Sequence, residues 1–67
     1  MGKRFSREEL ERMLGEMGGR WLRILEATAI SRGVYHGELI LPAEWGYSRE
    51  VKVYMENGHL REVETFP

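Results

Sequence analysis

The absence of cysteine is the feature that most constrains how this chain of 67 residues can fold. Chains this short have modest cores and usually add disulfides, a metal, an oligomer interface or very regular local structure. Without cysteine, disulfides and thiolate metal sites are excluded. The two histidines, His36 and His59, also lack a spacing that would place two metal ligands on one face. We therefore expect a single domain, residues 1–67, that has no cofactor or metal and depends on local structure and on a partner chain.

The charged residues are of few kinds. All eleven acidic residues are glutamate, most basic residues are arginine, and aspartate and glutamine are absent. This composition is typical of proteins from hot habitats, although a high-GC genome also enriches arginine and glycine. No apolar run reaches the length of a membrane span, and the N-terminal residues are charged where a signal peptide would be apolar. We expect a cytoplasmic protein without a membrane partner.

The clearest local signal is an S-x-x-E capping box at Ser6 and Glu9, which marks the start of a helix. Phe5 before the cap and Leu10 at the fourth helical position are spaced as a hydrophobic staple. One apolar stripe follows at helical spacing, made of Leu10, Met13, Leu14 and Met17. Gly18 and Gly19 tolerate the left-handed geometry of a helix end. The sequence therefore predicts an amphipathic helix over about residues 6–18.

The C-terminal part reads as a β-hairpin. Apolar and polar residues alternate from Val51 to Glu56, Asn57-Gly58 is the strongest two-residue hairpin turn, and a second strand runs from His59 to Phe66. The register of this turn places Met55 opposite Leu60, but it puts Val63 on the other face of the sheet. Either a bulge shifts the register or both faces are partly covered.

Residues 20–41 are ambiguous. Residues 20–30 read either as a second helix that ends at Gly33 or as a strand that returns through residues 34–41, and we favour the two strands. A turn at Arg32-Gly33 then pairs Ile30 with Tyr35 and Ile24 with Leu41. In this arrangement both faces of the sheet carry apolar side chains, while one helix covers one face only.

These elements predict an α+β fold: an N-terminal amphipathic helix (about 6–18) followed by a four-stranded antiparallel β-meander. The second apolar face requires the sheet to curl into a small SH3-like barrel or to meet another molecule. The order of helix and strands resembles PepSY-type modules. The segment Gly-Val-Tyr-His-Gly-Glu-Leu at 33–39 after a helix resembles Sm-type and other small SH3-like barrels. Neither resemblance carries a diagnostic motif, so neither implies a function.

The sequence contains no recognisable catalytic motif. Nucleophilic catalysis needs a serine, cysteine or lysine within reach of an oriented base, and Ser6 and Ser48 are expected to be a helix cap and a loop residue. No phosphate-binding glycine motif is present. His36 and His59 are expected to be structural. We therefore expect a protein that is not an enzyme.

Two binding surfaces are predicted. The loop around Pro42–Arg49 carries Trp45, Tyr47 and Arg49, a composition typical of interface hot spots, unless Trp45 folds back over the end of the sheet. We expect a binding or assembly module that acts through protein–protein contact, by self-association or by regulation of a larger complex. The alternative is nucleic-acid binding, because residues 1–33 hold most of the basic side chains. Its surface would comprise Arg20, Trp21, Arg23, Arg32 and Tyr35.

Overall fold

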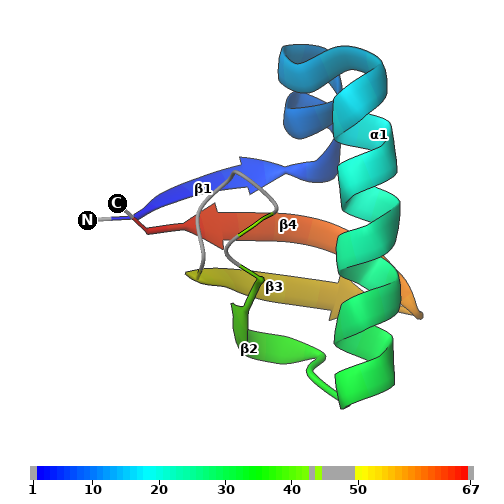
Figure 1. Ribbon diagram of the computed structural model, residues 1–67, viewed down its shortest axis with the longest axis vertical. Coiled ribbons are helices and arrows are strands. Elements are labelled where there is room, and N and C mark those ends of the chain that lie inside the picture. The colour runs from blue at the N-terminus through cyan, green and yellow to red at the C-terminus, as the bar shows by residue number, and fades with distance from the viewer. Residues whose placement is uncertain (1, 43, 45–49, 67) are drawn as a thin grey trace.

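The chain forms one helix and four strands in a computed structural model that describes residues 2–42, 44 and 50–66. Their order is β1 (Lys3–Ser6), α1 (Arg7–Arg32), β2 (His36–Ile40), β3 (Glu50–Glu56) and β4 (His59–Thr65). The strands make one antiparallel sheet in the order β1-β4-β3-β2, and α1 crosses one face of it (Figure 1). The predicted α+β class and the four-stranded antiparallel sheet are confirmed. The sheet is open, with β1 and β2 as its edges, so it is not the SH3-like barrel considered above.

The predicted start of the helix is confirmed. The hydroxyl of Ser6 accepts a hydrogen bond from the Glu9 backbone N–H at 3.1 Å, and the Ser6 N–H donates to the Glu9 carboxylate at 3.2 Å. The residues before the cap form β1, which the sequence reading missed. β1 pairs with the end of β4, where Phe5 lies opposite Val63 and Lys3 opposite Thr65. The described N- and C-terminal ends of the chain therefore lie side by side (Figure 1).

Residues 20–30 are helical, so the prediction of a strand here was wrong, as were the pairs Ile30–Tyr35 and Ile24–Leu41. The buried residues of this part of α1 follow helical spacing: Gly18, Trp21, Leu22, Leu25 and Ala29. Gly33 ends the helix with φ 69° and ψ 24°. The Gly33 N–H donates a hydrogen bond to the Ile30 carbonyl, and the Val34 N–H donates one to the Ala29 carbonyl. This is the hydrogen-bond pattern of a Schellman motif. The alternative prediction for residues 20–30, a helix that ends at Gly33, is correct.

A kink at Gly15 divides α1 into two segments, residues 7–14 and 16–32. Gly15 has φ 65° and ψ −142°, a conformation that only glycine adopts without strain. The predicted stop at Gly18-Gly19 was therefore wrong, and helix resumes directly after Gly15. A Cβ on Gly18 would lie 2.5 Å from the Leu14 Cβ, so the absence of a side chain lets the two segments pack closely.

The kink also corrects the predicted apolar stripe. Leu10 is buried and Leu14 packs against the core, but Met13 and Met17 are 64% and 68% exposed. The change of direction at Gly15 takes Met17 off the line of Leu10 and Leu14, whereas Met13 is exposed within the first segment itself. Apart from Leu10, the buried residues of α1 lie in the second segment.

The predicted hairpin is confirmed, and so is the bulge. Met55 lies opposite Leu60, but the register then shifts so that Tyr54 faces Glu62 and Val53 faces Val63. The shift returns Val63 to the same face as the other apolar residues of the hairpin. The side chains that fill the core between this face and α1 are Leu10, Trp21, Leu22, Leu25, Ala29, Leu39, Leu41, Val51, Val53, Met55, Leu60 and Val63.

The face of the sheet that points away from α1, which we call the open face, is polar, so the prediction of two apolar faces was wrong. One row across the four strands consists of Arg4, Glu64, Lys52 and Glu38, whose charges alternate in sign. Such cross-strand neighbours attract one another in contact with water. Most of the apolar residues assigned to this face had been placed there by reading residues 20–30 as a strand, whereas Ile40 does lie on it.

In the part of the chain that the structure describes, no helix is both long enough and apolar enough to cross a membrane.

Candidate functional site

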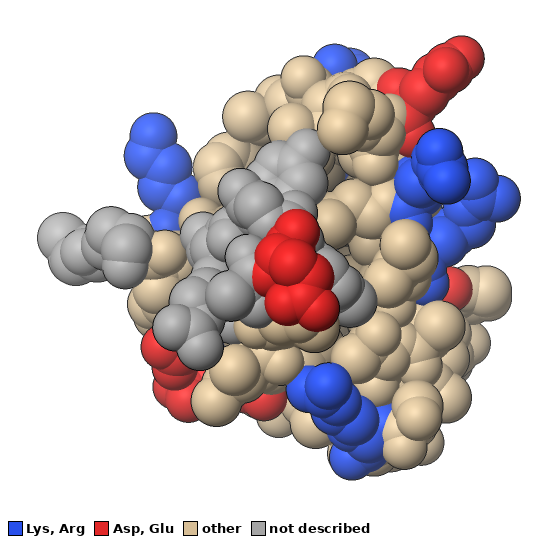
Figure 2. Space-filling model, viewed as in Figure 1, with Lys and Arg blue, Asp and Glu red and all other residues tan. Residues whose placement is uncertain are grey.

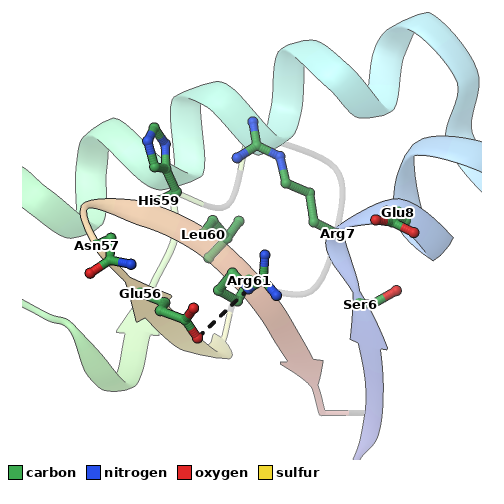
Figure 3. Close-up of a pocket in the computed structure, with 8 residues that line it drawn as sticks. All are labelled: Ser6, Arg7, Glu8, Glu56, Asn57, His59, Leu60 and Arg61. Atoms are coloured by element: carbon green, nitrogen blue, oxygen red, sulfur yellow. Dashed lines mark ion pairs between the residues drawn. The ribbon is translucent and has the colours of Figure 1, made fainter.

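A groove of about 470 Å³ lies where the start of α1 approaches the turn between β3 and β4 (Figure 3). β1 ends at Ser6, opposite Glu62, so the first residues of β4 pair with β3 but have no strand on their other side. The groove is lined by Ser6, Arg7, Glu8, Glu56, Asn57, His59, Leu60 and Arg61. Figure 3 shows the side chains of Arg7 and His59 extending toward the second segment of α1, while Glu56 and Arg61 form an ion pair at 3.8 Å.

Glu26 connects the groove to the second segment of α1. Its Oε2 accepts a hydrogen bond from the Leu60 backbone N–H at 2.7 Å and one from Nη1 of Arg7 at 2.9 Å. Arg7 also contacts Glu11 at 3.3 Å, and Nδ1 of His59 lies 3.8 Å from Glu26. Arginines and carboxylates at the groove thus neutralise one another. These contacts connect the helix, the strand and the N-terminal part of the chain. The imidazole of His59 is exposed in the groove, and no hydrogen bond in the described structure joins it to a hydroxyl group.

A second polar cluster lies on the open face. The guanidinium of Arg4 donates to both carboxylate oxygens of Glu62, at 2.8 and 3.1 Å, and stacks 4.0 Å above the ring of Tyr54. Tyr54 in turn donates to Glu64 at 3.1 Å. The hydrogen bond to Glu62 raises the pKa of Arg4, so this guanidinium stays charged. These contacts satisfy the cluster internally, as expected of a solvated sheet face.

The outward side of the second segment carries a different kind of surface. Exposed residues recur here at alternating spacings of three and four, which keeps them in one line along a helix: Met17, Arg20, Ile24, Ala27 and Ser31. We call this set the outward stripe. Met17 and Ile24 are 68% and 50% exposed. Figure 2, viewed from the side on which α1 crosses the strands, shows a mostly uncharged surface over the helix with basic side chains beside it.

Two arginines of this surface have no counter-charge in the described structure. Arg4, Arg7 and Arg61 each have a carboxylate within 4 Å. Among residues 2–42, 44 and 50–66, Arg20 in the outward stripe and Arg23 beside it take part in no ion pair. An exposed apolar line with unpaired arginines is typical of binding surfaces more than of solvated helix faces.

The structure separates the residues predicted for nucleic-acid contact. Arg20 and Arg23 are exposed, but Trp21 is only 8% exposed and belongs to the core, so its ring cannot stack on a base without leaving the core. Tyr35 is 56% exposed and precedes β2. Arg32 donates to the Ile40 carbonyl at 2.9 Å. The residues predicted for protein contact, Trp45, Tyr47 and Arg49, lie outside the described residues.

The sequence reading missed the outward stripe. Its signal is present, because residues 17, 20, 24, 27 and 31 keep the same three-four spacing as the buried residues of the segment. That spacing has meaning only for a helix, and residues 20–30 had been assigned to a strand.

Metal binding has no candidate in the described structure, where no three histidine, aspartate or glutamate side chains gather in a way that could hold an ion. Comparisons with family models, with curated proteins and with solved structures give no match for this chain. The contacts described above are therefore the only basis for assigning a function.

Proposed function

We propose that the protein is a small binding module that contacts another protein through the outward stripe of α1. The observation that carries the proposal is the exposure of Met17 and Ile24, 68% and 50%, in one line on the side of α1 that points away from the sheet. Burying a large aliphatic side chain contributes about 1.5–3 kcal/mol. Met17 and Ile24 are exposed to water in the described fold, and contact with a partner would bury them.

The fold does not need these side chains. The core between α1 and the sheet is filled by residues of the opposite helix face, among which Leu22 and Leu25 are fully buried. The open face is mainly polar, and on it Arg4 pairs with Glu62 and Tyr54 donates a hydrogen bond to Glu64. The stripe therefore contains apolar side chains of α1, Met17 and Ile24, that the described fold leaves in water.

Nucleic-acid binding by the same helix has weaker support. Arg20 and Arg23 are unpaired within the described chain, which favours phosphate contact. However, the chain has a net charge of −1, and the tryptophan expected to stack is in the core. A strongly basic surface is the usual mark of nucleic-acid-binding domains.

The test compares two exposed isoleucines. Ile24 lies in the outward stripe and Ile40 lies on the open face, 50% and 65% exposed, so Ile24→Lys and Ile40→Lys make the same change on different surfaces. Each immobilised variant is used to capture proteins from the cells that make the chain, after circular dichroism has shown that both variants fold. We expect proteins that the unaltered chain and Ile40→Lys retain and that Ile24→Lys loses. Equal capture by Ile24→Lys and the unaltered chain would overturn the proposal.

A further inference from the structure

The shape of the outward stripe indicates what kind of segment fits it. From Met17 to Ser31 the stripe follows one side of a straight helical segment for about 21 Å. Its three-four spacing is the spacing by which one helix packs against another at a small crossing angle. Ala27 and Ser31 are small, which allows a partner backbone to approach closely near the end of the segment. A single helix laid along α1 fits this surface better than a flat or concave partner.

The charges on the stripe indicate the composition of that helix. Arg20 stands in the line of apolar residues and Arg23 borders it, and neither has a carboxylate partner in the described chain. Glu26, the acid nearest to Arg23 in the sequence, is engaged with Arg7 and Leu60. Glu16, the acid nearest to Arg20, forms no ion pair with it in the described chain. A partner that covers Ile24 must also approach both guanidinium groups, and carboxylate side chains of that partner would pair with them there.

A second copy of the same helix fits poorly. Pairing two copies of the segment, in either direction, brings four arginines into one interface, with Glu16 of each copy as the acid exposed on this side. In a parallel pair, Arg20 would stand opposite its own copy. Like charges brought together at an interface weaken association and select against that partner.

We propose that the partner segment is an amphipathic α-helix whose apolar line is bordered by glutamate or aspartate side chains about one turn apart, placed to meet Arg20 and Arg23. This inference rests on the proposed function, because it names the partner of the same stripe.

The test uses three designed helical peptides of about 20 residues, long enough to remain helical when stapled. They share one apolar line and carry glutamate, glutamine or lysine at the bordering positions. Each is titrated by fluorescence anisotropy into the full chain and into three variants, Arg20→Glu, Arg23→Glu and Arg12→Glu. Arg12 is exposed on the segment before the kink, so Arg12→Glu makes the same charge change away from the stripe.

We expect the glutamate peptide to bind the unaltered chain about tenfold more tightly than the glutamine peptide, and the lysine peptide to bind most weakly. Arg20→Glu and Arg23→Glu should reverse this order, and Arg12→Glu should keep it. Equal affinities for the three peptides, or an unchanged order in both stripe variants, would overturn the acidic-helix inference and leave the stripe as a binding surface. Dimerisation of the chain that Ile24→Lys abolishes would likewise replace the acidic helix by a second copy. Absence of binding by all three peptides would also overturn the inference, and the capture experiment above then decides the proposed function separately.

Discussion

The backbone N–H of Leu60 donates a 2.7 Å hydrogen bond to Oε2 of Glu26, so a helix side chain binds the start of β4 beyond the point where its pairing with β1 ends. The same oxygen accepts from Arg7 at 2.9 Å, and the Glu26 side chain is only 18% exposed. A hydrogen bond to a partly buried charged group contributes more than a surface ion pair. One carboxylate thus joins the N-terminus, the helix and the hairpin.

Replacing Glu26 should therefore destabilise the fold. We expect Glu26→Gln to lower the free energy of unfolding by about 1–2 kcal/mol and Glu26→Ala by about 2–3 kcal/mol, because alanine leaves both donors without this acceptor. Urea denaturation followed by circular dichroism measures both values. Glu62→Gln, at the more exposed pair with Arg4, serves as the control and should cost less than Glu26→Gln. Equal losses at the two glutamates would contradict the role given to Glu26.

A second prediction concerns the kink at Gly15. Alanine at Gly15 would have to adopt φ 65° and ψ −142°, so Gly15→Ala should lower the free energy of unfolding by about 1–3 kcal/mol. Gly19 lies in the helix with no atom within 4 Å of an added Cβ, and Gly19→Ala should be neutral or stabilising by about 0.5–1 kcal/mol. Thermal denaturation of the two variants compares them. If Gly15→Ala matched Gly19→Ala, the two segments would form one continuous helix instead.

Leu25 and Ile24, neighbours in sequence that differ in burial, should respond differently to truncation. Leu25 is fully buried, so Leu25→Ala should cost about 2–5 kcal/mol. Ile24 is half exposed, and Ile24→Ala should change the stability by no more than about 0.5 kcal/mol. Chemical denaturation distinguishes the two, and a large loss at Ile24 would mean that the helix presents another face to the sheet.

The position of Trp21 can be read from its fluorescence. Trp45→Phe leaves Trp21 as the only tryptophan, and its burial predicts a blue-shifted emission that acrylamide quenches poorly. Adding oligonucleotides should leave this emission unchanged, because the ring packs in the core. Emission like that of tryptophan in water, or strong quenching by an oligonucleotide, would instead support the stacking role first predicted for Trp21.

The parts of the fold that depend on local chemistry were predictable from the sequence. The capping box at Ser6 and Glu9 and the turn at Asn57-Gly58 specify a helix start and a hairpin through hydrogen bonds between residues near in sequence. The bulge was predictable as one of two alternatives, because Val63 had to share a face with Met55.

The parts that depend on distant contacts were not predictable. Residues 20–30 contain β-branched and aromatic side chains that suit a strand, and burial of Trp21, Leu22 and Leu25 against the sheet decides for a helix. β1 gains its pairing only from β4, at the other end of the chain. The outward stripe exists only if residues 20–30 are helical, and the sequence allowed either a helix or a strand there. The candidate site could therefore not be predicted from the sequence.

The binding role of the outward stripe is tested most directly by site-specific photo-cross-linking in the cells that make the protein. A photoreactive benzoylphenylalanine replaces either Ile24 on the stripe or Ile40 on the open face, which are both exposed. We predict that position 24 gives a cross-linked product of defined mass and that position 40 does not give that product. The absence of a product at position 24, or the same product from both positions, would contradict a protein contact through this face of α1.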